Sequence, residues 1–233
     1  MRADCRQMTA LVHAFVAALP TALFMVCAAF CPDLHAAEIA ALIKNQSGEP
    51  VADAVVVAVP AEGAIKPPAQ PGQDIVDQIN HQFVPRVKPV LVGTSVTFPN
   101  KDNVRHHVYS FSPTKKFELP LYSGTPAAPV VFDKPGVVVL GCNIHDWMVG
   151  YIYVSESPYF AKTGSDGKAL LTDLPARAYT VRAWHPQMEG TEEATRLPAD
   201  LGRSRRTELA WELKLKPEFR AHRMDPGRGT GRY

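Results

Sequence analysis

The chain has 233 residues, 46% of them hydrophobic and 21% charged, and this length can bury one sizeable core or two small ones. Its formal net charge at pH 7 is +2, which gives no reason to expect a nucleic acid as partner. The same balance of apolar and charged residues excludes a chain that is disordered throughout.

Residues 1–37 are typical of an export signal. Arg2 and Arg6 precede a long apolar run, and small residues follow that run. Positive charge on the N-terminal side predicts that the remainder lies outside the cytoplasm, so we expect a periplasmic protein. The chain would contact a membrane only if this segment stays uncleaved. Cleavage before His35 would instead leave an N-terminal histidine able to chelate copper.

Removal of the signal would leave Cys142 as the one cysteine of the exported chain, because Cys5, Cys27 and Cys31 all lie within the signal. Cys142 would then have no partner for an internal disulfide. In an oxidising compartment an unpaired thiol is expected to be buried, paired between chains or bound to a metal. The surroundings of Cys142 therefore carry the most information about function.

Apolar and polar residues alternate along most of the exported chain, which predicts β-strands. Residues 61–73 are rich in Pro, Gly and Ala and predict a loop. A hairpin is expected around Asp133 and Gly136, and a short helix at residues 71–82 or 192–202. Many short strands separated by Gly, Asp and Pro turns predict an all-β fold, an antiparallel sandwich. The expected strands lie within residues 37–44, 51–60, 81–102, 104–112, 128–142, 148–157, 164–186 and 205–216.

A cysteine, a histidine and a methionine follow one another at three-residue steps in the stretch Cys142-x-x-His145-x-x-Met148. A thiolate, an imidazole and a thioether form a soft set of donors, and copper accepts a thioether that zinc rarely takes. An electron-transfer copper site also needs a second imidazole. His106 and His107 on an upstream strand are the candidates, and only one can point inward because successive side chains face opposite sides of a sheet.

This pattern resembles the cupredoxins, and among them amicyanin and plastocyanin. In that family the upstream ligand histidine stands immediately before an Asn-Val pair. Placing Val108 on the family's valine assigns the ligand to His106 and puts His107 on the family's asparagine. The loop that starts at Cys142 looks like the short ligand loop of amicyanin. The resemblance covers about residues 80–155 and implies a Greek-key β-sandwich with one type 1 copper site, held by His106, Cys142, His145 and Met148.

The segments that flank this core resemble a second family. EPVADAVVVAV at residues 49–59 and GSDGKALLTDLPARAYTVRAWHP at residues 164–186 look like the opening and closing strands of a transthyretin-like or carboxypeptidase-regulatory sandwich. That module mediates packing or binding and carries no catalysis. The whole chain resembles the periplasmic plastocyanin-like proteins that are labelled with methylamine utilisation. We therefore expect a signal peptide (1–37), regulatory-like strands with a linker (38–75), a copper domain (76–157), further regulatory-like strands (158–218) and a disordered tail (219–233).

The cupredoxin resemblance implies an electron carrier, not an enzyme, that cycles one copper ion between Cu(II) and Cu(I). Cys142 would supply the covalent path for the electron, His106 and His145 would complete the plane, and Met148 would tune the potential. A redox partner protein would dock near His145 and Trp147, because an aromatic side chain suits a transient, partly apolar contact. The alternative is a copper storage or delivery module, or a structural β-sandwich without redox turnover, which the regulatory-like flanks favour.

Each of these residues also has an ordinary structural interpretation. A free cysteine such as Cys142 is often a buried core thiol, and a residue such as Met148 often fills a gap between strands. His81 and His185 are expected to be surface or hydrogen-bonded residues and not ligands. A cysteine nucleophile with His145 as its base is a further alternative, but it lacks a third orienting group and leaves the methionine unexplained.

Overall fold

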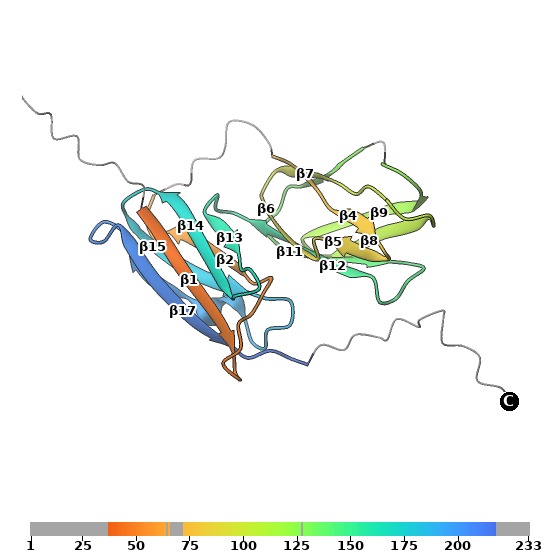
Figure 1. Cartoon of the computed structure of the whole chain (residues 1–233). Helices are drawn as coiled ribbons and strands as arrows, with labels where there is room; N and C mark the ends of the chain where they lie inside the picture. The colour runs from red at the N-terminus through yellow and green to blue at the C-terminus, as the bar shows by residue number, and fades with distance from the viewer. Residues whose placement is uncertain (1–36, 64, 66–71, 127, 218–233) are drawn as a thin grey trace, which may run out of the picture. The chain divides into compact units, whose positions relative to one another are not determined.

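Strands make up nearly all the regular structure in the computed structural model of the chain (Figure 1), which confirms the all-β fold. Among the described residues the one helical element is the short 3-10 helix η1 (Glu192–Thr195). No helix in this part of the chain is long and apolar enough to cross a bilayer. The predicted export signal, apart from Ala37, and the predicted disordered tail lie outside the described residues. The described residues are 37–63, 65, 72–126 and 128–217, and all belong to one compact unit, His35–Tyr233.

The two flanking segments of the chain build two sheets together. In β1 (Ala37–Asn45) alternate side chains are buried, which places Ile39, Ala41 and Ile43 in a core cluster. The neighbours of β1 come from the C-terminal part of the chain, one antiparallel and one parallel. The first sheet has the order β14 (Lys168–Leu174), β1, β17 (Arg206–Leu213), and the second β13 (Phe160–Lys162), β2 (Val55–Pro60), β15 (Ala178–Trp184), β16 (Leu197–Asp200).

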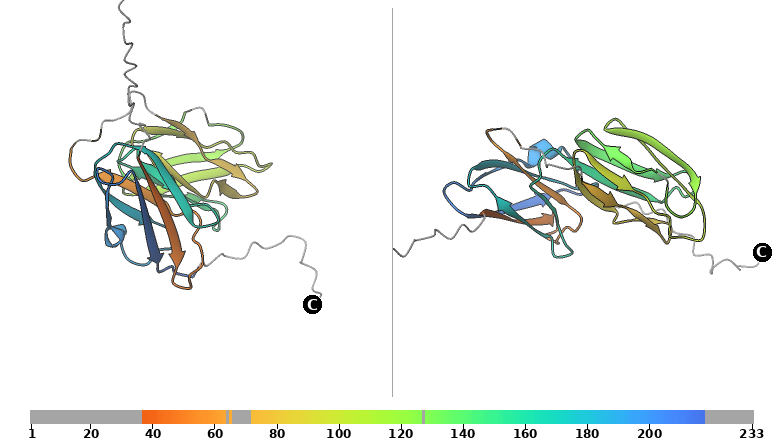
Figure 2. Two further views of the ribbon diagram at one scale, coloured as in Figure 1. Left: turned by 60° about the vertical axis from the view of Figure 1, so that its left-hand side comes forward. Right: turned by 90° about the horizontal axis from the view of Figure 1, so that it is seen from above.

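The middle of the chain forms a five-stranded sheet and two smaller ones, shown from two further directions in Figure 2. Buried side chains on three neighbouring strands, Val108, Leu140 and Ile152, belong to one core cluster that also contains Cys142 and Met148. The large sheet has the order β6 (Val87–Leu91), β12 (Val149–Ser155), β11 (Gly136–Cys142), β8 (His106–Ser112), β9 (Lys115–Tyr122). The smaller ones are β10 (Val130–Phe132), β7 (Thr94–Thr97), β3 (Gln73–Ile75), and the hairpin β4 (Asp77–Ile79), β5 (Gln82–Val84).

Two of the core clusters belong to either the flanks or the middle of the chain, and a third contains residues of both. Ile39 and Leu171 belong to the cluster of the flanking strands, whereas Phe98 and Leu140 belong to that of the middle strands. The flanking segments therefore share a core although the middle of the sequence separates them. The expected domain boundaries themselves stay predictions, because all described residues belong to one compact unit.

Two local predictions are wrong and a third holds only in part. Residues 130–142 form no hairpin: β10 pairs with β7, whereas β11 pairs with β12 and β8. The Asp-Lys-Pro-Gly turn specifies a change of direction but not the strand that will be the partner. Residues 71–82 form β3, β4 and β5 because pairing with other strands overrides a local preference for helix. Residues 192–202 hold only η1 before β16, since Pro198 disfavours helical backbone at the residue before it.

Gly150 of β12 lies where the side chain of Phe83 on β5 packs against the backbone. A Cβ atom at this position would lie 2.8 Å from Cβ of Phe83 and 3.0 Å from two of its ring carbons. We expect Gly150→Ala to lower the free energy of unfolding by about 1–3 kcal/mol, as overpacking does. Urea denaturation measures this, with Gly164→Ala as a control whose new Cβ would meet only a movable carboxylate oxygen. A loss below about 0.5 kcal/mol would show that this contact is not tight.

Candidate metal centre

The loop between β11 and β12 carries three of the four predicted ligands. β11 ends at Cys142 and β12 begins at Val149, so His145 and Met148 lie in the connection. The amide of Met148 donates a hydrogen bond to the carbonyl of His145 at 2.9 Å. This bond folds the loop into a turn, which brings Met148 back towards the core while His145 stays at its edge.

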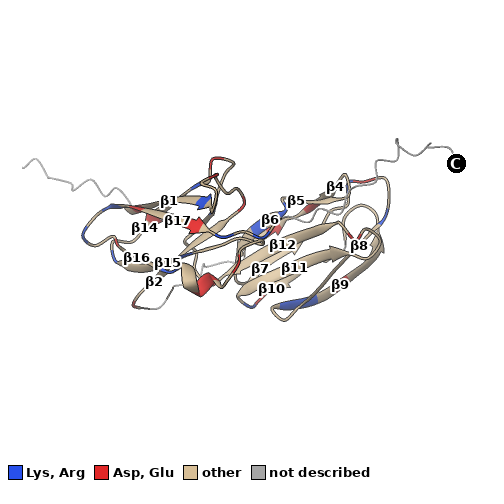
Figure 3. Cartoon of the chain, turned by 90° about the horizontal axis from the view of Figure 1, so that it is seen from below, with Lys and Arg blue, Asp and Glu red and all other residues tan. Residues whose placement is uncertain are grey.

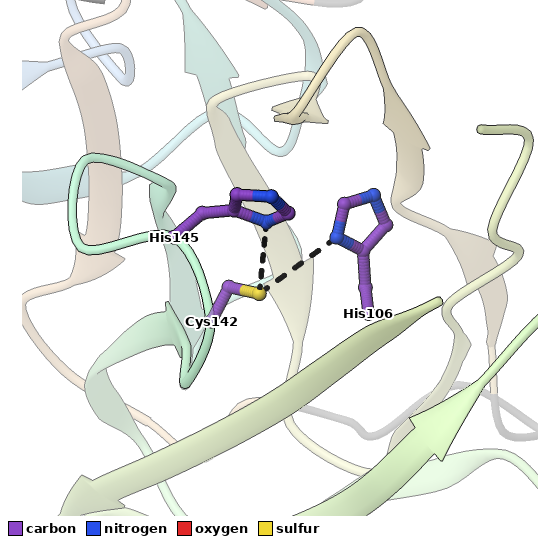
Figure 4. Close-up of side chains that lie close together, drawn as sticks. All are labelled: His106, Cys142 and His145. Atoms are coloured by element: carbon purple, nitrogen blue, oxygen red, sulfur yellow. Dashed lines mark hydrogen bonds between the residues drawn. The ribbon is translucent and has the colours of Figure 1, made fainter. Parts of the chain in front are cut away.

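The structure brings His106, Cys142 and His145 together (Figure 4). The Sγ atom of Cys142 lies 3.8 Å from Nδ1 of His106 and 3.7 Å from Nδ1 of His145. All three donor atoms lie within 4.8 Å of one another. The register of β11 on β8, with Cys142 opposite Val108, places the end of β11 beside the start of β8 and so joins the loop to His106.

The donor atoms of the triad fit a metal ion better than they fit a hydrogen bond. With its one proton the thiol can donate to one imidazole and can only accept an N–H from the other, whereas a metal ion would bond to all three atoms at once. With bonds of about 2.0 Å to nitrogen and about 2.3 Å to sulfur, a trigonal angle of about 120° separates the two atoms by about 3.7 Å. The observed separations of 3.8 and 3.7 Å match that arrangement, which is the one that copper takes with two imidazoles and one thiolate.

The carboxylate of Asp102 holds the ring of His106. Its Oδ2 atom lies 2.8 Å from Nε2 of His106, and the backbone amides of Asn80 and His81 donate to the same carboxylate at 2.6 and 2.9 Å. Burial alone would raise the pKa of Asp102, but the hydrogen bonds from the His81 amide, the His106 ring and the Asn80 amide outweigh burial and lower that pKa. An ionised carboxylate accepts the proton of Nε2, which leaves the Nδ1 lone pair directed at Cys142.

We expect Asp102→Asn to weaken copper binding about 10- to 100-fold, the usual cost of losing a partner behind a metal-binding imidazole. The neutral amide would accept the His106 N–H more weakly and would no longer select one tautomer. Competition against a copper chelator measures the affinity. Asp133→Asn is the matched control, because that exposed carboxylate accepts a hydrogen bond from Lys115 and contacts no predicted ligand. Equal affinity of Asp102→Asn and the parent protein would show that His106 needs no such support.

His107 points away from the triad. Its Nε2 atom lies 2.9 Å from Glu118 on β9, and its ring contacts that of Tyr109 two residues along β8. His106 is fully buried, with an exposed fraction of 0%. The alternation of side chains along β8 therefore places His106, and not His107, beside Cys142.

Met148 is buried in the core cluster that also contains Cys142. The loop turns at the bond from the Met148 amide to the His145 carbonyl, and the Met148 side chain is buried in the core. A buried thioether in this place is chemically suited to copper. The role of Met148 as a fourth, axial ligand stays a prediction.

His145 lies at the partly exposed edge of the site. Its ring contacts that of Trp147, whose centroid is 5.3 Å away and whose side chain is 44% exposed. Burial lowers the pKa of His145, and the nearby His81 and His106 lower it further, against an opposite effect of Asp102. The lowered pKa favours the neutral imidazole, which is the form that binds a metal.

The sequence did not place His81 relative to the triad, and the structure puts its ring beside it. Its ring centroid lies 4.6 Å from that of His145 and 5.6 Å from that of His106, so a third imidazole adjoins the two in the triad. The signal available in the sequence was an Asn-His pair between two short apolar runs, which is where a two-residue hairpin turn can occur. His185, by contrast, accepts the backbone amide of Gln187 at Nδ1, as expected for a hydrogen-bonded histidine.

Comparison with known proteins finds partial similarity to solved structures. No protein-family model and no curated protein sequence matches the chain. A purple cupredoxin from Nitrosopumilus maritimus is 30% identical and covers 36% of this chain and 99% of its own, with a TM-score of 0.31. An amicyanin variant is 24% identical and covers 36% of this chain and 83% of its own, with a TM-score of 0.33.

A third similar structure is a copper-containing nitrite reductase from Thermus scotoductus SA-01. It is 25% identical, covers 50% of this chain and has a TM-score of 0.34, but this chain spans only 28% of its length. These neighbours are all copper proteins by name. Because the TM-scores are low, the case for a metal site rests on the donor geometry of this chain.

Proposed function

We propose that this protein is a periplasmic type 1 copper protein that carries electrons by cycling between Cu(II) and Cu(I). One observation carries the proposal. Two imidazole nitrogens and a cysteine sulfur converge from a strand start, a strand end and a loop, and both nitrogens lie at the distance from the sulfur that a trigonal copper site needs. The resemblance of the His106–Val108 and Cys142–Met148 stretches to cupredoxin motifs supports the same metal.

Each residue of the site has a defined task in this proposal. A bound copper ion would supply the one-electron couple. Cys142 would give the electron a covalent path into β11, and His106 and His145 would complete the set of donors that hold the ion. The buried thioether of Met148 would be a further donor that tunes the potential. Burial of Cys142 and His106 keeps water away from the sulfur, and their fixed positions would keep rearrangement small when the oxidation state changes.

Electrons would enter and leave through His145, the partly exposed member of the triad. Ile144 and Trp147 stand on either side of it and are 47% and 44% exposed. Apolar side chains of this kind suit a small, transient contact with a redox partner protein. Lys and Arg lie in short segments separated by acidic and uncharged ones (Figure 3), a distribution that offers no support for a nucleic-acid partner.

Location in the periplasm follows from the predicted export signal. Outside the cytoplasm Cys142 would lack an internal disulfide partner, and it is the free, buried cysteine of the described residues. A thiolate held between two imidazoles and bound to copper would be protected from oxidation. An oxidising compartment and the donor geometry of the site therefore both favour a metal-bound thiolate at Cys142.

A second candidate function is copper storage or delivery. The observation that favours it is the pair of sheets built by β1, β2 and the strands after residue 158, which an electron carrier of this kind does not require. Such strands provide a surface on which an acceptor protein can bind. In this function the metal itself, and not an electron, would leave the site.

Reversible reduction separates the two candidates. The copper-loaded protein is treated with ascorbate and then with ferricyanide, while its visible absorption and its bound copper are followed. An electron carrier loses its colour on reduction, regains it on oxidation and keeps its copper throughout. Release of Cu(I) to a chelator on reduction, without return of the colour, would contradict electron transfer and favour delivery.

A further inference from the structure

Asn80 and His81 form an unusual turn next to the metal site. They make the two-residue loop between β4 and β5, in which Ile79 pairs with Gln82. Both residues have positive φ angles, 53° for Asn80 and 60° for His81. Turns of this type favour glycine at the second position, because other side chains are strained there. A histidine at this place therefore carries a backbone cost that a glycine would not.

The side chain of His81 contacts both imidazoles of the triad. Its ring meets that of His145 edge to face, with centroids 4.6 Å apart and an interplanar angle of 77°. It meets the ring of His106 at 5.6 Å and 89°. His106 and His145 themselves are 5.0 Å apart. The three rings thus pack against one another. The nitrogens of His106 and His145 belong to the converging donor atoms, and those of His81 do not.

Asp102 connects the turn to the triad. Its carboxylate accepts the amides of Asn80 and His81 and also the ring of His106. One partly buried anion therefore fixes both the backbone that carries the His81 ring and the orientation of the first imidazole. His145 receives no such bond from Asp102, and the contact with His81 ties its ring to this framework. Strained backbone that is held by its surroundings is a recurrent feature of functional sites.

We propose that His81 is a positioning residue of the copper site, which holds the ring of His145 in the orientation that binds copper. The inference rests on the proposed function and assigns His81 no bond to the metal. Its ring acts by packing edge to face against the ring of His145. The strained turn is the means by which the fold brings that ring to the site.

Three variants test this role. His81→Gly removes the ring and also the backbone strain at residue 81, because glycine tolerates a positive φ angle. The matched control Asn80→Gly removes the backbone strain at residue 80 and keeps the His81 ring. Both substitutions suit the turn, so both are expected to fold. His81→Phe keeps a flat ring without a nitrogen. The purified proteins are compared in two ways: the rate of copper loss to a chelator, and the NMR signals of the His145 ring in the metal-free state.

We expect His81→Gly to lose copper about 10-fold faster than Asn80→Gly, a loss typical of residues that support a metal ligand. In the metal-free protein its His145 ring should exchange between orientations, while Asn80→Gly and His81→Phe keep the parent's single ring conformation and copper-loss rate. If His81→Gly matches Asn80→Gly in both measurements, the positioning role is wrong. If His81→Phe loses copper as fast as His81→Gly, the nitrogen and not the packing matters, which also overturns it.

The metal-free measurement keeps this inference apart from the proposed function. If the parent protein binds no copper, the proposed electron-transfer function fails. The NMR signals of His145 in the four metal-free proteins still decide whether His81 holds that ring. If all four bind copper and His145 is equally ordered in each, the positioning role fails while the function stands.

Discussion

Replacing Cys142 by serine is expected to abolish the intense visible absorption of the copper-loaded protein. That absorption arises from charge transfer between a cysteine thiolate and Cu(II), and a serine hydroxyl cannot replace the thiolate at neutral pH. Copper affinity should fall by more than about 100-fold. Loss of a residue that only hydrogen-bonds to a ligand already lowers metal affinity by up to about 100-fold, and here the proposed ligand itself is lost. Absorption spectra and chelator competition measure the two effects.

Met148→Leu is the control for Cys142→Ser. It removes the other sulfur of the loop and keeps a buried apolar side chain of similar volume, so the fold should persist. The visible band is expected to remain in Met148→Leu and only to shift, since the thiolate and both imidazoles are unchanged. A band that survives in Cys142→Ser would refute the assignment of Cys142 as the ligand.

Replacement of His106 and of its neighbour His107 is expected to affect copper affinity very differently. His106→Asn should reduce copper affinity by more than about 100-fold, because it deletes a donor that lies 3.8 Å from Cys142 Sγ. His107→Asn should change it less than about 3-fold, since His107 faces Glu118 on the other side of β8. Isothermal titration with copper compares them. Similar losses in both variants, or a greater loss at His107, would contradict the register of β8.

Alternation and motif spacing predicted much of the fold and most of the triad. The alternation at residues 37–44 predicted a strand, and Ile39, Ala41 and Ile43 are buried on one face of β1 because side chains two residues apart share a face. The steps from Cys142 to His145 and Met148 predicted one loop. The adjacent His106 and His107 supplied two candidates for the second imidazole, of which strand alternation allows only one to point inward. These features depend on residues close in sequence.

Features that depend on distant contacts could not be predicted in this way. The partner of β10 is β7, which lies some thirty residues upstream, and a turn at Asp133 cannot specify that choice. Strand β9 was not expected, although it pairs with β8 along its length, because Pro120 and two lysines weaken the strand pattern.

The groups that support the predicted ligands could not be predicted either, because they too depend on contacts between residues distant in sequence. Asp102 looks like an ordinary loop carboxylate in the sequence, and its task appears only where the amides of Asn80 and His81 meet the ring of His106. His81 looks like a surface histidine, because the turn that carries it and the loop of His145 are more than sixty residues apart. Pattern reasoning finds donors by type and spacing, whereas the groups that orient them are found by geometry.

Titration of the metal-free chain with Cu(II), followed by visible absorption, tests the central claim most directly. The titrated chain begins at Glu38, so Cys142 is its one cysteine. We predict that an intense thiolate-to-copper band grows with added metal and stops growing at one copper ion per chain. A colourless copper complex, or a chain that binds no copper, would contradict the electron-transfer account.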